Sequence, residues 1–199
     1  MKTVVLVVLL AIVALGAIYI IFQQPAYPMN ENDAKKFFLE DLREKYPNAD
    51  IREIMDITQL TSSDGSSYYQ LKARVTNGEG TPCPERIHVY YDYPPKNYVS
   101  QPPEYITKSC KVCINEPHCI LAFTEEAIIA SHTYNGTGEI EKFIKDNSDA
   151  AATASAMDSY GNYTGVWLVK WSSPSSALSY TAVLSKTQNT VLEIIKESN

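Results

Sequence analysis

The sequence predicts an α+β protein in which an N-terminal transmembrane helix precedes two helix-plus-antiparallel-sheet modules. Three observations support this fold class. An uncharged apolar run fills residues 4–22, several later segments alternate apolar and polar residues with the period of a strand, and an order of one helix followed by strands occurs twice. The 199-residue chain is long enough to form two small domains after the apolar run.

The apolar run predicts a transmembrane signal anchor over residues 1–22. Val4–Phe22 carries no charge and, as a helix, would extend about 28 Å, close to the thickness of a bilayer's hydrocarbon core. The lipid bilayer is therefore the expected partner of residues 4–22. A cleaved signal peptide is the alternative, because Ala14-Leu15-Gly16 resembles a cleavage site.

The flanking charges predict the orientation of this anchor. Lys2 precedes the run, whereas the first basic residue after it is Lys35. The positive-inside rule then places the N-terminus in the cytoplasm and residues 23–199 outside a cell membrane that the chain crosses once. Residues 23–29 contain two prolines and are expected to form a linker.

The first module is predicted over residues 30–93. Asn30 begins a helix whose apolar residues recur at helical spacing and which ends at Pro47-Asn48. A strand is expected from Ile51 to Ile57. Alternation then predicts half-buried strands in an antiparallel sheet, at residues 69–76 and from Ile87 to Tyr93.

The second module is predicted over residues 137–199 and repeats this order. Thr137 can cap a short helix with an apolar stripe made by Ile140, Phe143 and Ile144. Turn-forming residues separate the segments that follow. The expected strands are Ala152–Ser159, Tyr163–Trp171, Leu178–Leu184 and Thr190–Ile195.

Three stretches of the first module resemble the PepSY module. They are residues 32–38, 46–51 and 68–75, and residues 140–195 are similar in order, with Trp167–Trp171 as the central strand. The resemblance implies a cystatin-like fold, in which a curved sheet wraps around one helix, and an extracytoplasmic role in binding or restraining peptidases or other partners. The chain departs from the Asp-x-x-Thr-Gly turn of that family, because residues 185–190 lack the Asp and the Gly.

The cysteines gather around the connecting segment, residues 94–136. Outside a membrane, an even number of cysteines indicates disulfides, and three pairings of four cysteines are open. A zinc site is the alternative in a reducing compartment, and a redox-active C-x-x-C motif is a third reading. The expected disulfide residues are Cys83, Cys110, Cys113 and Cys119.

Few residues suggest catalysis. His88, Tyr90 and Asp92 share one strand face, where an acid–base role competes with a simple solvated surface. His118 adjoins Cys119, and Ser131 adjoins His132, yet neighbours in sequence do not by themselves create a metal ligand set or a nucleophile–base pair. We therefore predict no catalytic residue, no cofactor and no metal ligand.

Composition limits the partners. The net charge of −6 argues against a nucleic-acid binder, so no nucleic acid is expected. Two sequons lie in predicted turns and are candidate glycosylation sites, at Asn135 and Asn162. Tyrosines are frequent, and the strands Ile87–Tyr93 and Trp167–Trp171 are the expected contact surfaces for a protein or peptide.

These observations leave three functions. The leading one is a membrane-anchored extracytoplasmic protein that binds, inhibits or supports an unknown protein or peptide without catalysis. A metal- or thiol-dependent redox protein using the Cys110–Cys119 cluster is the first alternative. A surface filament subunit, in which the apolar N-terminal helix packs against its copies, is the second.

Overall fold

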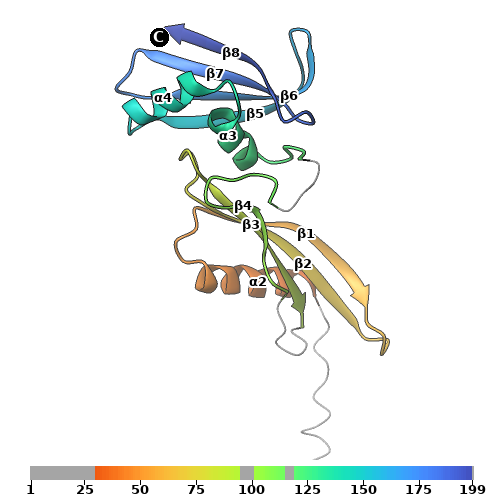
Figure 1. Ribbon diagram of the computed structural model, residues 1–199. Coiled ribbons are helices and arrows are strands. Elements are labelled where there is room, and N and C mark those ends of the chain that lie inside the picture. Colours follow the sequence, from red (N-terminus) through yellow and green to blue (C-terminus); the bar gives the residue numbers. More distant parts are fainter. Residues whose placement is uncertain (1–29, 95–100, 115–118, 199) are drawn as a thin grey trace, which may run out of the picture.

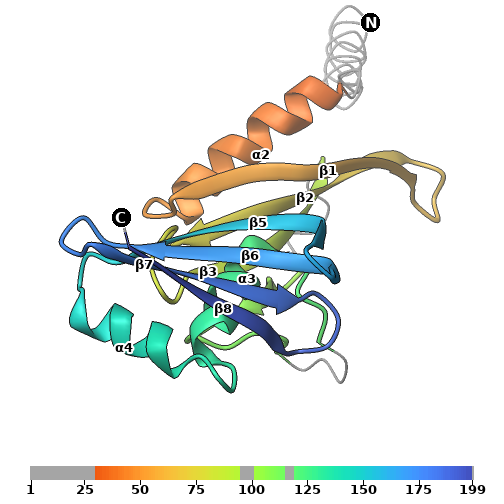
Figure 2. The same cartoon turned by 90° about the horizontal axis from the view of Figure 1, so that it is seen from above.

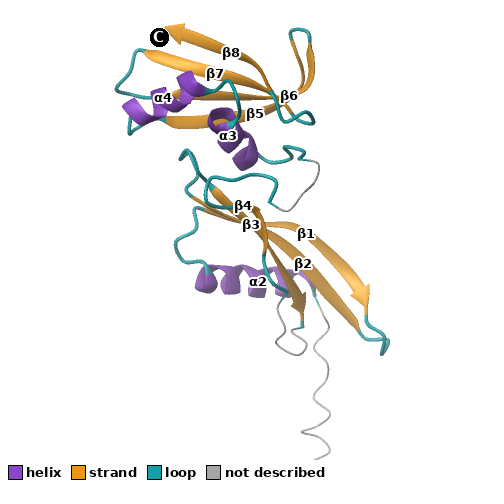
Figure 3. Ribbon diagram, in the orientation of Figure 1, coloured by secondary structure: helices purple, strands orange, loops and turns teal. Residues whose placement is uncertain are grey.

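The described chain forms two antiparallel sheets of four strands each, one above the other in Figure 1. The computed structural model describes residues 30–94, 101–114 and 119–198. In both sheets the strand order follows the chain, so every neighbouring pair is a simple antiparallel connection. Figure 3 shows that strands dominate and that helices lie beside the sheets.

The first unit consists of one helix and the first sheet. The helix α2 (Glu31–Lys45) begins at Asn30, whose side-chain oxygen accepts a hydrogen bond of 2.9 Å from the Asn32 amide. Helix α2 lies along one face of the sheet in Figure 1, and its apolar stripe packs on that face. The strands are β1 (Ile51–Thr61), β2 (Ser67–Asn77), β3 (Glu85–Tyr93) and β4 (Glu104–Thr107).

Alternation along β2 separates the two faces of the first sheet. Leu71, Ala73 and Val75 are fully buried against α2, while Lys72 and Arg74 between them point to the other face. The face away from α2 is therefore polar, and this face carries the candidate site.

The second unit has two helices on its sheet, α3 (Thr124–Thr133) and α4 (Gly138–Asp146). Trp167 and Trp171 are almost completely buried in the core between this sheet and the helices. Figure 1 shows α3 between the two sheets, and Figure 2 shows the strands of the second sheet from above. The strands are β5 (Ala151–Tyr160), β6 (Tyr163–Ser172), β7 (Leu178–Ser185) and β8 (Val191–Ser198).

The predicted fold class is wrong. The described residues are mostly two antiparallel sheets, with three short helices of 15, 10 and 9 residues. A membrane-spanning helix needs about 20 apolar residues, and no helix in the described part of the chain is long and apolar enough to cross a membrane. This finding also contradicts the predicted single-pass localisation at the cell membrane, with residues 23–199 extracytoplasmic.

Some predictions concern residues that the structure does not describe. The predicted anchor over residues 4–22, its contact with lipid and the linker over residues 23–29 lie outside the described residues. Within the described ranges, the segment predicted as a connector, residues 94–136, supplies strand β4 to the first sheet and helix α3 to the second.

Candidate functional site

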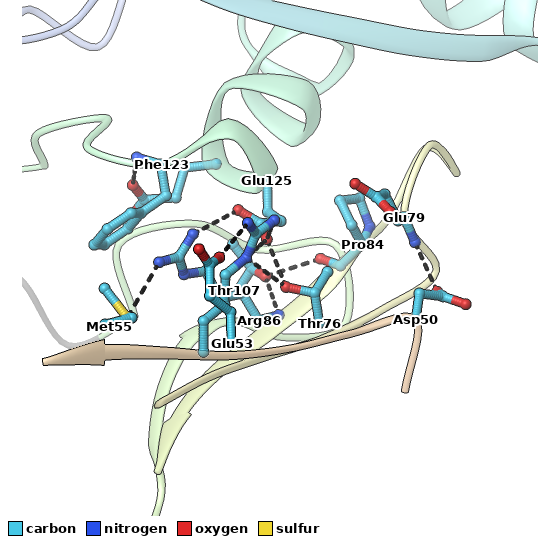
Figure 4. Close-up of polar contacts among 12 residues, drawn as sticks. Asp50, Glu53, Met55, Thr76, Glu79, Pro84, Arg86, Thr107, Phe123 and Glu125 are labelled. Atoms are coloured by element: carbon cyan, nitrogen blue, oxygen red, sulfur yellow. Dashed lines mark hydrogen bonds and ion pairs between the residues drawn. The ribbon is translucent and has the colours of Figure 1, made fainter. Parts of the chain in front are cut away.

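A cluster of charged side chains joins the two units. Glu125, in the first turn of α3, accepts hydrogen bonds from Arg74 Nη2 at 2.6 Å and from Arg86 Nη1 at 3.0 Å. The Thr76 hydroxyl donates to the same carboxylate at 2.6 Å. Figure 4 shows Thr76 and Arg86 reaching from the first sheet toward Glu125 on the helix. We call these four residues the charged joint.

The charged joint is shielded from water. Glu125 is 2% exposed and Arg86 is 5% exposed, and the Arg86 guanidinium lies 3.8 Å from the centre of the Phe123 ring. Burial alone would raise the pKa of Glu125, but the Thr76 hydroxyl and the two arginines hold that pKa below its ordinary value. Glu125 is therefore ionised, and its charge is matched inside the protein.

A chain of hydrogen bonds leads from the charged joint to the surface. Arg86 Nε donates to His88 Nε2 at 3.1 Å, and an arginine nitrogen can only donate. The proton of the neutral His88 ring therefore sits on Nδ1 and points to Glu104 Oε2, 3.3 Å away. The Tyr90 hydroxyl donates to the same oxygen at 2.7 Å.

His88 and Glu104, two members of this chain of hydrogen bonds, have displaced pKa values. Burial, followed by the positive charges of Lys72 and Arg86, lowers the pKa of His88 below its usual 6.5. The Tyr90 hydroxyl, then His88 and Lys72, lowers the pKa of Glu104 below its usual 4.5. Near neutral pH the arrangement is a neutral imidazole between a guanidinium and a carboxylate.

Beyond the charged joint, the same face of the first sheet remains partly exposed. Lys72 lies directly opposite Tyr90, and Gln70 lies opposite Asp92, to which it donates at 3.3 Å. These four side chains are half-exposed. We call the following residues the open face: Met55, Asp56, Gln70, Lys72, Tyr90, Asp92 and Glu104.

The predicted disulfides are present. Cys83 pairs with Cys110, and Cys113 pairs with Cys119, with Cα–Cα distances of 4.7 and 5.2 Å. The first bridge ties the loop between β2 and β3 to the segment after β4. His132, in the last turn of α3, lies beside it, with Nε2 3.9 Å from the Cys110 sulfur.

The other sequence candidates are scattered. Asn135 is exposed at the turn between α3 and α4, beside a hollow of about 590 Å³, and Asn162 is exposed in the turn between β5 and β6. The Ser131 hydroxyl donates to the Ile128 carbonyl and accepts from Trp171 Nε1, so it does not face His132. His118 lies outside the described residues.

The sequence interpretation differs from the structure in two respects. It expected the Trp167–Trp171 strand to be a contact surface, which is wrong because both tryptophans fill the core. It also missed the charged joint, whose members are far apart in sequence. The available signal was the placement of Arg74 and Arg86 on the polar face of the sheet, where two neighbouring cations need an anion.

Comparisons with known proteins supply no identity. No family model, no curated protein and no solved structure matches this chain. The resemblance to PepSY modules therefore stays a prediction.

Proposed function

We propose that this chain is a non-catalytic binding protein that contacts a protein or peptide through the open face. The observation that carries the proposal is the division of one sheet face. Its inner end is closed by Phe123 and Glu125 from the second unit, while its outer end leaves Lys72, Tyr90 and Asp92 half-exposed. The charged joint supports the position of this face relative to the second unit.

The chemistry of the open face suits recognition of a polar or basic segment. Its carboxylates belong to Asp56, Asp92 and Glu104, and its only cation is Lys72. Tyr90 offers ring area and a hydroxyl fixed by Glu104, and such pre-ordered groups lose little entropy on binding. A complementary partner would carry lysine or arginine opposite the three carboxylates.

The β1 edge of the first sheet is a less suitable contact. A register irregularity interrupts β1 between Ile54 and Asp56, and charged side chains such as Arg52 and Glu53 lie along the strand. Bulges and charges of this kind disfavour the pairing of a further strand. Contact through the face is therefore favoured over strand addition at β1.

The histidine beside the open face, His88, has both ring nitrogens engaged. His88 is 1% exposed and lies between Arg86 and Glu104, and His132 Nε2 donates to the Pro82 carbonyl at 2.7 Å. A general base needs a free lone pair within reach of a substrate. Neither ring nitrogen of His88 offers such a lone pair, which supports a binding function for the open face.

The proposal is tested by removing charge from the open face without changing its shape. The double variant Asp56→Asn/Asp92→Asn keeps every side-chain volume, and an asparagine at 92 can still accept from Gln70. The matched control is Glu40→Gln/Glu44→Gln, which removes the same charge from the exposed side of α2. Partners captured from extracts of the source organism are quantified by mass spectrometry.

We expect at least one partner that both the wild-type protein and the control variant capture. The open-face variant should capture about tenfold less of it, which corresponds to a loss of roughly 1.4 kcal/mol in binding free energy. The reconstituted pair should show the same ratio in a binding titration. Equal capture by all three proteins would refute the proposal. Turnover of a substrate that depends on open-face residues would replace binding with catalysis.

A further inference from the structure

Three metal-binding atoms meet where the two units touch. The sulfurs of Cys83 and Cys110 and a ring nitrogen of His132 all lie within 4.8 Å of one another. The cysteines belong to the first unit and the histidine to helix α3 of the second. In the oxidised protein the two sulfurs are bonded to each other, so they are not available to a metal.

We propose that reduction of the Cys83–Cys110 bridge creates a zinc site made by these two thiolates and His132. Two thiolates and one imidazole form a ligand set that suits zinc, with a fourth position left for water. The same pair of cysteines thus links the chain in two ways, by a disulfide when oxidised and by a metal when reduced.

The distances suit such a site. In a tetrahedral zinc centre, a thiolate sulfur and an imidazole nitrogen lie about 3.6 Å apart. Cys110 Sγ and His132 Nε2 are already 3.9 Å apart. The two sulfurs have to separate to about 3.8 Å, which rotation of two cysteine side chains can provide, since these are short and one of them is exposed.

His132 is held in position for ligation. Its ring packs against Trp171 in a T-shaped arrangement, with centroids 5.7 Å apart and an interplanar angle of 88°, and Nε2 donates to the Pro82 carbonyl at 2.7 Å. When Nε2 turns to a metal, the proton can move to Nδ1, which is the tautomer that a histidine bound to zinc through Nε2 adopts.

A dithiol can supply the electrons and protons that reduction of the Cys83–Cys110 disulfide requires. The dithiol transfers two electrons and two protons to the Cys83–Cys110 bond, which breaks to give two thiols, and the reductant closes to its own disulfide. Binding of Zn²⁺ then releases one proton from each thiol. His132 binds as the neutral ring and only exchanges its tautomer, so the site as a whole releases two protons.

The test uses Co²⁺ as a spectroscopic probe for the zinc site in the full chain. Cys113→Ser/Cys119→Ser is the background, because reduction would otherwise free two more thiols. After treatment with dithiothreitol and its removal without oxygen, we expect one Co²⁺ per chain, with thiolate charge-transfer bands and the visible bands of tetrahedral cobalt. Zn²⁺ should displace the cobalt, and the oxidised protein should bind none.

The decisive comparison is His132→Gln in the same background. Glutamine can still donate to the Pro82 carbonyl but provides no imidazole, so we expect at least a tenfold weaker Co²⁺ affinity and a changed visible spectrum. Equal affinity and spectrum in this variant would overturn the proposal, as would failure of the reduced protein to bind cobalt. Loss of the native circular dichroism on reduction would overturn it as well, because the site needs both folded units.

Discussion

The two units share a strand order but close their sheets in different ways. The second sheet buries Trp167 and Trp171 under two helices, in an apolar core. The first sheet buries an apolar face under α2, and its opposite face carries charged side chains. On that face Arg86 is almost fully buried, together with Glu125 from α3. The difference teaches that apolar packing builds each unit, whereas a buried ionic cluster is among the contacts that join them.

The largest expected effect comes from breaking the charged joint. Glu125→Ala leaves Arg86 buried without its anion, and removing one partner of a buried ion pair typically costs about 3–5 kcal/mol of unfolding free energy. Glu139→Ala, on the exposed side of α4, is the control and should change stability by less than about 0.5 kcal/mol. Urea denaturation measures both, and similar small losses would show that the joint is not a strong contact.

The same comparison can be sharpened by replacing charge with apolar packing. Because buried ion pairs contribute little beyond a hydrophobic replacement, Arg74→Met/Arg86→Met/Glu125→Leu should fold with a stability within about 2 kcal/mol of wild type. If the triple variant were as unstable as Glu125→Ala, the charged side chains would contribute more to the free energy of unfolding than apolar side chains that fill the same volume.

The two disulfides should differ in their contributions. Loop-closure entropy predicts about 3.5 kcal/mol for Cys83–Cys110, with a sequence separation of 27, and about 2.2 kcal/mol for Cys113–Cys119, with a separation of 6. We expect paired serine substitutions to reproduce this order in thermal unfolding. A larger loss from the shorter loop would point to contacts that only the second bridge maintains.

Acidification should act on the first unit through His88. Its pKa is lowered in the folded protein, so the unfolded chain takes up a proton first, and stability falls as the pH drops below about 6.5 toward the folded pKa. One such group contributes a slope of at most about 1.4 kcal/mol per pH unit. His132 has a lowered pKa as well and adds to the same window.

The variant His88→Gln isolates the contribution of the first unit. Its unfolding free energy, measured by urea titration from pH 7 to pH 5, should vary less with pH than that of wild type. His132→Gln provides the matched variant on α3. Identical pH profiles for wild type and His88→Gln would exclude His88 as the sensitive group.

The smallest effect is expected at the exposed ion pair of the second sheet. Lys170 Nζ and Glu197 Oε2 are 3.1 Å apart, with about half of each side chain exposed. Such pairs contribute roughly 0–1 kcal/mol because water and salt screen them. Lys170→Met should therefore change the unfolding midpoint little, and a loss comparable to that of Glu125→Ala would remove the distinction between buried and exposed pairs.

Local pattern predicted most strands of the molecule. The alternation around Leu71 and Ala73 identified β2 and its buried face, because a strand exposes alternate residues to opposite sides. Strand β4 was missed, since Glu104–Thr107 is short and follows prolines. Helix α3 was missed because it is buried nearly all around and shows no amphipathic stripe.

The site depended on contacts that local pattern does not encode. The oxidised state of the four cysteines was expected from their even number, but the pairing required the fold. The charged joint brings Arg74 and Arg86 to Glu125 across long sequence separations, and the open face becomes visible only once that end of the sheet is closed.

The charged joint also affects the chain while it is being synthesised. The strands of the first sheet are complete at Thr107, before Glu125 has been added. Until α3 emerges, the surface that will later be enclosed presents two arginines to water instead of an apolar patch. Unfinished chains that expose hydrophobic surface tend to aggregate, so we expect the use of charge at this boundary to lower the tendency of a nascent first unit to aggregate before the rest of the polypeptide is made.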